Sequence, residues 1–209
     1  MNKLPDRTVE RLSQYRRSLL NCLAKGKTHI FSHEIAGMHH ITPVQVRRDI
    51  MLIGYTGTLR KGYDVKELID LIGKILDTPE GQKVAIIGVG NLGHAMIQYF
   101  SGKRSKLSIV AGFDIHPEKV NRVFGGVPCY HLDQLQDIVK KDDIEIVIIT
   151  TPAEESPRIA EMCVIAGVKG ILNYTPKSIN VPSHVYLEEY DMTTSLEKVA
   201  FFVKKNKMI

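Results

Sequence analysis

Three glycines at fixed spacing constrain the fold of this chain more than any other feature. Gly88, Gly90 and Gly93 follow an apolar run and open an amphipathic segment. In a strand–turn–helix context, the first glycine permits a tight turn, the second lets a pyrophosphate approach the backbone, and the third lets helix and strand pack closely. Free N–H groups and the helix dipole favour negative charge at such a helix start. The motif predicts a dinucleotide-binding loop made of Gly88, Val89, Gly90, Asn91, Leu92 and Gly93.

A carboxylate stands at the expected distance beyond this loop. Asp114 ends the next apolar segment, about 20 residues after the last glycine of the motif, where an acidic residue bonds the adenosine ribose hydroxyls. A negative charge there repels the 2′-phosphate that distinguishes NADP(H), and no arginine adjoins it in the sequence. We therefore expect the cofactor to be NAD(H).

Apolar strand-like segments alternate with amphipathic helical ones from residue 83 onward. Fully apolar strands that alternate with helices are typical of a parallel sheet covered on both faces, so we predict an α/β, Rossmann-type domain. The expected strands are 83–88, 107–114, 127–131, 144–150, 168–174 and 184–190. The expected helices are 91–99, one around 132–141, 154–167 and a final amphipathic helix at 195–204.

The first 78 residues have a different pattern, which predicts an N-terminal winged helix-turn-helix domain. Helices are expected at 8–24, at 33–38 with Ser32 as its cap, from Pro43, and at 65–76; a hairpin or wing is expected at 58–65. Thr42 as N-cap, proline at the first helical position and Gln45 as capping-box partner mark the start of the third helix.

The third helix is predicted to face DNA. At 100° per residue, Val46, Ile50 and Ile53 point towards the domain core, whereas two arginines, a valine and a methionine point away from it. Arginine can grip guanine edges or phosphates in the major groove, and apolar groups can touch a thymine methyl. Solvated surface arginines are the alternative interpretation. The predicted DNA-contacting residues are Thr42, Val44, Gln45, Arg47, Arg48, Met51, Arg60 and Lys61.

The distribution of charge supports a polyanionic partner for the N-terminal part alone. Residues 1–61 contain 11 Lys/Arg and 4 Asp/Glu, whereas the rest of the chain is slightly acidic. We expect no membrane partner, because no apolar run approaches the roughly 20 residues that span a bilayer. Three scattered cysteines and three histidines, His33, His39 and His40, lack the spacing of metal ligands, so no metal is expected and a reducing cytoplasm is the expected location.

Domain boundaries are expected at 1–78 for the winged-helix domain, 82–190 for the Rossmann NAD(H)-binding domain and 191–209 for a C-terminal helix. The chain after Gly93 is long enough to finish a nucleotide fold and little more. It lacks room for the substrate domain of a dehydrogenase, which favours a sensor rather than an enzyme. The alternatives are a small NAD-dependent oxidoreductase and a CoA- or nucleotide-binding module, and Asp114 argues against CoA.

Several motifs together resemble the bacterial redox-sensing transcriptional repressors of the Rex family, over nearly the whole length. The matching stretches are KLPDRTVERLSQYRRSL, QVRRDI, GYDVKEL, GVGNLGHAMIQY, GFDIHPEKV, TTPAEESPRIAEM, AGVKGILNYTP and VPSHVYLEEYDMTTSLEKVAFF. The chain departs from the family in its wing, where Leu59 takes the place of an arginine and one glycine is missing, and at His116 and "NYTP". These departures bear on which operator sequence is bound and on how NADH is distinguished from NAD⁺, and not on the class of protein.

The resemblance implies a homodimer that binds operator double-stranded DNA when NADH is scarce and releases it when NADH binds. It implies that the C-terminal helix is exchanged between subunits. By motif, Tyr99 would lie near the nicotinamide, and Arg17 and Asp191 would form a switching contact between subunits; as alternatives, Tyr99 is a core aromatic and Asp191 a helix cap. The nicotinamide end would be lined by Thr151, Pro152, Asn173 and Tyr174.

Overall fold

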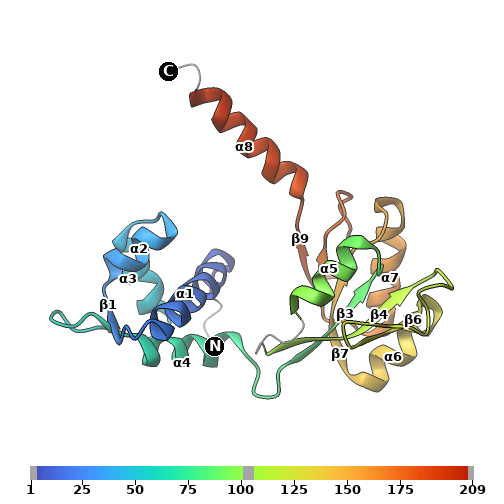
Figure 1. Ribbon diagram of the computed structural model, residues 1–209, viewed down its shortest axis with the longest axis horizontal. Helices are drawn as coiled ribbons and strands as arrows, with labels where there is room; N and C mark the ends of the chain where they lie inside the picture. The colour runs from blue at the N-terminus through green and yellow to red at the C-terminus, as the bar shows by residue number, and fades with distance from the viewer. Residues whose placement is uncertain (1–3, 101–105, 207–209) are drawn as a thin grey trace. The chain divides into compact units, whose positions relative to one another are not determined.

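The computed structural model describes residues 4–100 and 106–206 and divides the chain between Pro79 and Glu80 into two compact units (Figure 1). Each unit has its own apolar core, and each is described separately.

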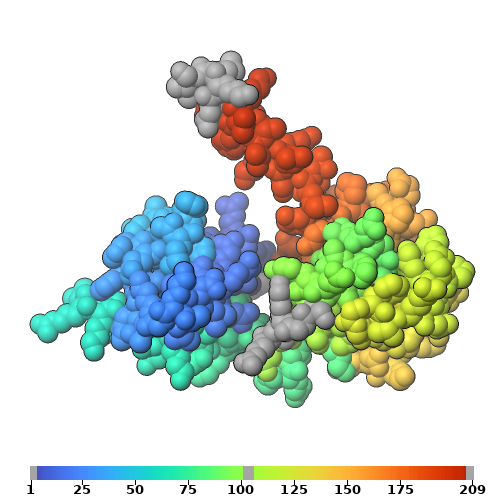
Figure 2. All heavy atoms as spheres, in the orientation of Figure 1, coloured from blue at the N-terminus to red at the C-terminus, as the bar shows by residue number. Residues whose placement is uncertain are grey.

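The first unit contains four helices and two short strands in its described residues. They are α1 (Asp6–Ala24), β1 (His29–Ile30), α2 (Ser32–His39), α3 (Pro43–Leu52), β2 (Tyr63–Asp64) and α4 (Val65–Leu76). The apolar faces of the helices meet in one core, where Leu12, Leu19 and Ile50 are fully buried. β1 and β2 pair antiparallel, and the hairpin between α3 and β2 projects from the unit (Figures 1 and 2). This arrangement is the predicted winged helix-turn-helix.

The start of α2 and the capping of α3 differ in part from the sequence-based predictions. Ser32 is the first residue of α2 rather than its cap; Phe31 is the N-cap, and its backbone N–H donates to Glu34 Oε2 at 2.9 Å. Thr42 does cap α3, because its hydroxyl accepts the backbone N–H of Gln45 at 3.2 Å. The side chain of Gln45, however, does not complete a capping box, since it bonds a carboxylate one turn further along the helix.

The second unit is a seven-stranded sheet in the order β5-β6-β4-β3-β7-β8-β9. All its strands are parallel except β5, a short antiparallel edge strand that the sequence analysis did not predict. The strands are β3 (Gln82–Ile87), β4 (Leu107–Asp114), β5 (Val123–Phe124), β6 (Val127–His131), β7 (Ile144–Ile149), β8 (Gly170–Asn173) and β9 (Tyr186–Glu189). Without β5, this is the doubly wound Rossmann order, as predicted.

Helices cover both faces of this sheet. On one face α6 (Leu135–Asp142) and α7 (Ser156–Ala166) pack against Ala85 and Ile87, and on the other α5 (Asn91–Phe100) packs against Val84 and Ile86. Short 3₁₀ turns, η1 (Leu132–Gln134) and η2 (Ala153–Glu155), lead into α6 and α7. Successive residues of β3 thus serve opposite cores, as a sheet buried on both faces requires.

The last helix, α8 (Met192–Asn206), is longer at both ends than the predicted 195–204. Its side chains are exposed from Met192 through Lys205. Several of them are large and apolar, namely Leu196, Val199, Phe201, Phe202 and Val203. An amphipathic helix that leaves such side chains in water has an apolar face without a partner in the described part of its own chain.

Candidate dinucleotide site and nucleic-acid interface

The glycine loop between β3 and α5 has the geometry that its spacing predicts. Gly88 has φ +95°, and a Cβ there would lie 2.8 Å from the carbonyl oxygen of Thr150. A Cβ on Gly93 would overlap the carbonyl oxygen of Gly88 on the adjoining strand end. A Cβ on Gly90 would meet nothing within 4 Å. The first and third glycines are therefore required by the fold of this chain, whereas the second leaves open space beside the backbone.

A pocket of about 570 Å³ lies at the carboxyl ends of β3, β4 and β7. The strand order reverses between β3 and β7, which is where doubly wound sheets bind their ligands. The pocket is lined by Ile87, Gly88, Gly90, Phe113, Asp114, Ile115, His116, Lys119, Leu132, Thr150, Thr151, Pro152, Glu155, Arg158 and Ile159. The hydroxyl of Thr151 is buried there without a hydrogen-bond partner among the described residues. A buried hydroxyl that lacks a partner at the wall of this pocket fits a polar ligand.

Asp114 is positioned by four donors. Its Oδ1 accepts the backbone N–H groups of Ile115 (2.9 Å) and His116 (3.1 Å). Its Oδ2 accepts the N–H of Val89 (2.9 Å) and the ammonium of Lys119 (3.0 Å). Burial alone would raise the pKa of Asp114, but the bonds from Lys119 and the backbone outweigh it and hold the pKa below its usual value. Among the described residues no arginine contacts this carboxylate, but Lys119 does, which sequence reasoning missed.

Of the residues predicted to line the nicotinamide end of the cofactor, some line the pocket and others do not. Thr151 and Pro152 line the pocket, whereas Tyr99, Asn173 and Tyr174 do not. Tyr99 is exposed, with its ring edge-on to Phe100 at 5.2 Å between centroids. Asn173 is fully buried and organises its own turn: its amide donates to the Lys177 carbonyl and accepts from Thr175.

Tyr174 packs against Tyr190 with 5.1 Å between ring centroids. Its assignment to the nicotinamide end, like those of Tyr99 and Asn173, stays a prediction. The sequence analysis also missed Glu155 and Arg158, which form an ion pair at 3.4 Å at the rim of the pocket. Their spacing in the sequence does not identify them as pocket residues. They reach the pocket only because β7 ends beside the glycine loop and the segment that carries them follows β7.

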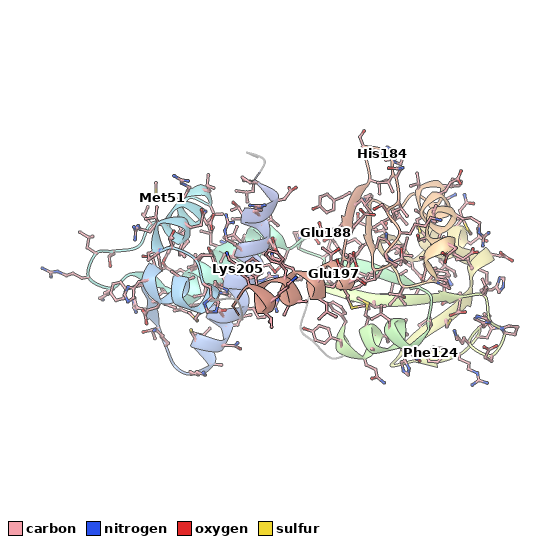
Figure 3. The ribbon with its side chains drawn as sticks, turned by 90° about the horizontal axis from the view of Figure 1, so that it is seen from above. Met51, Phe124, His184, Glu188, Glu197 and Lys205 are labelled. Atoms are coloured by element: carbon pink, nitrogen blue, oxygen red, sulfur yellow. The ribbon has the colours of Figure 1, made fainter. Side chains whose placement is uncertain are left out.

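In the first unit, the outer face of α3 is exposed as predicted. Val44, Arg47, Arg48 and Met51 are exposed and line a shallow depression together with Leu52. Met51 points away from the helices of its unit (Figure 3). An Nη of Arg47 donates to the hydroxyl of Ser32 on α2 at 3.2 Å, so this guanidinium is partly oriented by the preceding helix.

Behind that face lies a polar network that the sequence analysis missed. Asp49 is completely buried. Its carboxylate accepts two bonds from Arg11, at 2.7 and 2.8 Å, one from the Tyr15 hydroxyl at 2.9 Å and one from the Gln45 amide at 2.9 Å. Burial alone would raise the pKa of Asp49, but these bonds outweigh it and hold the pKa below its usual value. The network ties α3 to α1.

The predicted wing is a tight hairpin. Thr58 and Gly62 exchange two backbone hydrogen bonds of 2.8 Å, and the backbone N–H of Lys61 donates to the Thr58 hydroxyl. Three exposed residues, Leu59, Arg60 and Lys61, form the tip. A second depression connects the hairpin with Arg47, with Phe31 and with Ser32 at the start of α2.

Arg17 and Asp191 lie in different units. Arg17 is exposed on α1. Asp191 caps α8, since its carboxylate accepts the backbone N–H of Thr193 at 2.8 Å and the hydroxyl of Thr194 at 2.6 Å. These bonds lower the pKa of Asp191. The capping alternative is therefore present in this structure, and the contact between subunits stays a prediction.

Two further kinds of feature are absent from residues 4–100 and 106–206. No helix there is both long and apolar enough to cross a membrane. Within the same residues, His, Cys, Asp and Glu side chains form no group of three that could hold a metal ion. Cys22, Cys129 and Cys163 are free thiols.

Comparison with known proteins identifies the family. The family described as "CoA binding domain" matches residues 80–177, and the family described as "Putative DNA-binding protein N-terminus" matches residues 3–50. The redox-sensing transcriptional repressor Rex of Bacillus licheniformis is 37% identical over 99% of this chain and 96% of its own length. The Rex protein of Anoxybacillus flavithermus is 38% identical over 97% of this chain and 95% of its own. This chain belongs to the Rex family.

Solved structures of a Rex-family repressor agree with that assignment along the whole chain. The crystal structure of RSP with β-NAD⁺ and operator DNA matches with a TM-score of 0.90 and 29% identity, covering 100% of this chain and 96% of that one. RSP with β-NADH matches with a TM-score of 0.88 and 28% identity, covering 100% and 98%. Rex-family proteins are transcriptional repressors, so this chain is a regulator and not an enzyme.

Proposed function

We propose that this chain is a transcriptional repressor that senses the NADH/NAD⁺ ratio, binding operator DNA when NADH is scarce and releasing it when NADH binds. One observation carries the proposal. The same chain combines an open glycine loop over a pocket with an exposed, arginine-bearing α3, and a protein of matching fold has been solved with both β-NAD⁺ and operator DNA.

The dinucleotide occupies the pocket of the second unit. The backbone at Gly90 admits the pyrophosphate at the start of α5, where N–H groups and the helix dipole stabilise it. Thr151 supplies a hydroxyl that has no other partner among the described residues. Asp114 holds the loop through the Val89 N–H and receives the ribose at the rim, with Lys119 beside it. Tyr99, Pro152, Asn173 and Tyr174 complete the nicotinamide end.

DNA is bound by the first unit. Val44, Arg47, Arg48 and Met51 enter the major groove. Thr42 and Gln45, at the start of α3, lie where recognition helices contact base edges. The hairpin tip, with Arg60 and Lys61, follows the backbone or the adjoining minor groove, and the basic excess of residues 1–61 supports affinity for the phosphates.

The working unit is a homodimer in the cytoplasm. Its three parts are the winged-helix domain at 1–78, the Rossmann domain at 82–190 and a swapped C-terminal helix at 191–209. The exposed apolar side chains of α8 need a partner, and a second copy of this chain supplies one. Arg17 of one subunit pairs with Asp191 of the other. NADH then selects a dimer geometry in which the two α3 helices no longer fit successive major grooves, about 34 Å apart.

A mobility-shift titration tests the proposal. Full-length protein is mixed with fragments of the chromosome that encodes it, and NADH, NAD⁺ or NADPH is added. We expect a retarded fragment that NADH releases at lower concentration than the other two dinucleotides. The Arg47→Ala/Arg48→Ala double variant is the matched control, because it removes the exposed guanidiniums without touching the pocket. Retardation that NADH leaves unchanged would refute the sensing role, and equal retardation by the double variant would refute the DNA face.

A further inference from the structure

The side chain of Gln45 is constrained in a way that bears on which base it can read. Gln45 is the third residue of α3, and the N-terminal residues of a recognition helix contact base edges. Its side chain is half-buried and lies at the edge of the outward face that carries Val44 and Arg48. A free glutamine amide can rotate to present either its oxygen or its NH₂ group, and so can match more than one base.

The partner of Gln45 removes that freedom. Asp49, one helical turn further on, is ionised and completely buried, and an ionised carboxylate only accepts hydrogen bonds. The amide group that faces Asp49 Oδ1 at 2.9 Å must therefore be the NH₂ of Gln45. The amide oxygen accepts no hydrogen bond from any described residue. It remains available together with the second N–H of the same amide.

Asp49 itself cannot turn, because α1 holds it. Arg11 Nε and the Tyr15 hydroxyl both donate to Oδ2, at 2.7 and 2.9 Å. A second nitrogen of Arg11 donates to Oδ1 at 2.8 Å. Two parallel bonds from one guanidinium fix the plane of the carboxylate. The direction in which Oδ1 points at Gln45 is thus set by residues more than thirty positions earlier in the chain.

We propose that Asp49, held by Arg11 and Tyr15, locks the Gln45 amide in the orientation that reads adenine in the major groove of the operator. Adenine presents there an N7 acceptor beside an N6 donor, which matches one N–H and one carbonyl oxygen. Guanine presents two acceptors, N7 and O6, so its O6 would face the amide oxygen. Cytosine offers only its N4 donor and leaves the N–H unused. The inference rests on the proposed operator binding, and it assigns Asp49 as a positioning residue.

The test begins with the wild-type protein and a library of random duplexes, from which bound sequences are selected without NADH. We expect two inverted half-sites with one invariant adenine each at which the Gln45 amide makes contact. At that position 7-deazaadenine, which lacks N7, and purine, which lacks the N6 amino group, should each weaken binding several-fold. The same replacements at other adenines should have little effect. Selection of cytosine at the Gln45-dependent position would overturn the assignment to adenine.

Two variants connect that position with the network. Gln45→Leu leaves Asp49 with Arg11 and Tyr15, so it should fold normally. It should lose roughly tenfold or more of the preference for adenine over guanine, the scale of one good bidentate contact, while preferences elsewhere in the half-site stay unchanged. Tyr55→Phe, which removes a hydroxyl bond to Glu67 on α4 in the same unit, is the matched control and should select the wild-type sequence.

The base that Asp49→Asn selects at the position contacted by Gln45 distinguishes a role of Asp49 in orienting Gln45 from a purely structural role. Arg11 donates to both carboxylate oxygens, so an asparagine side chain at this position turns its NH₂ towards one of those donors in either orientation. The network that fixes the Gln45 amide is then broken, and the preference for adenine over guanine should fall at the position that Gln45 contacts, with the other positions of the half-site unchanged. If Gln45→Leu keeps the wild-type adenine preference, the proposal is wrong. If the wild type selects no duplex at all, the proposed operator binding itself fails.

Discussion

A methyl group added to each of the two later glycines of the dinucleotide loop should affect the stability of the protein differently. A Cβ on Gly90 meets nothing within 4 Å, and its φ is not positive, so Gly90→Ala introduces no overlap and no backbone strain. Alanine also restricts the unfolded chain, which stabilises a compatible site by about 0.4–1 kcal/mol. We expect a melting temperature equal to the wild-type value or higher by about 2–4 °C.

NADH binding by Gly90→Ala should be weakened, although the stability of the protein is not. The open space at Gly90 is where the proposed pyrophosphate approaches the backbone, and a methyl carbon needs about 3.5–4 Å from a phosphate oxygen, more than a hydrogen-bonded backbone allows. We expect the NADH affinity of Gly90→Ala to fall at least about tenfold, which corresponds to about 1.4 kcal/mol.

Gly93→Ala, unlike Gly90→Ala, should lose stability. Its Cβ would overlap the carbonyl oxygen of Gly88 and lie 3.1 Å from the Thr150 hydroxyl, so α5 must move away from β3. Overpacking of this kind costs about 1–3 kcal/mol. We expect a melting temperature several degrees lower, together with weaker NADH binding.

Thermal denaturation without ligand and calorimetric titration with NADH separate the two effects. Wild-type NADH affinity in Gly90→Ala would refute the assignment of this loop to the pyrophosphate. Wild-type stability in Gly93→Ala would refute the packing argument. A further consequence follows for Gly90→Ala: it should still bind operator DNA, and NADH should no longer release it.

The remaining predictions concern the other predicted contacts. Alanine at Arg47 or Arg48 should weaken operator binding by roughly 1–3 kcal/mol if that residue reads a base edge, with little change in melting temperature; a double variant that binds normally would contradict this. Asp114→Ala should lose most of the preference for NADH over NADPH in calorimetric titrations. The charge that repels a 2′-phosphate is gone, and Lys119 is left to attract that phosphate. Equal affinities of the wild type for NADH and NADPH would contradict this prediction. Operator DNA should weaken NADH binding by the same factor by which NADH weakens operator binding, since linkage is reciprocal. Asp191→Ala should change that factor more than either separate affinity, and wild-type NADH affinities that operator duplex leaves unchanged would exclude NADH as the signal.

Local patterns in the sequence predicted most of the fold. Helix and strand identities depend on apolar periodicity within about ten residues, and the glycine roles depend on a turn between neighbouring elements, so both are visible in the order of residues. The outward face of α3 was predicted for the same reason, because a helical wheel needs only the helix itself. The unpredicted strand β5 has two residues and pairs only with the start of β6, too short for any periodicity.

Side-chain partners far apart in the sequence could not be predicted in this way. Asp49 looks like an ordinary polar residue of an exposed helix, and its burial depends on Arg11 and Tyr15 from a helix that packs across the core. Gln45 follows the spacing of a capping box, but a buried carboxylate competes for its amide more strongly than the exposed N–H of Thr42. Asn173 likewise turns inward to organise a loop whose conformation no local pattern specifies.

The polar network also restricts how a signal can reach α3. α1 carries the anchors of Asp49 on its buried side and Arg17, the residue predicted to contact the partner subunit, on its exposed side. The same helix packs its apolar face into the single core that holds α3 and α4. Close-packed cores transmit displacement rather than absorb it. A force applied at Arg17 should therefore reorient the whole unit as one body, with Arg47, Arg48 and Gln45 unchanged relative to one another. It follows that NADH should abolish operator binding by misplacing two intact recognition helices, and that an isolated half-site should be much less sensitive to NADH than the full operator.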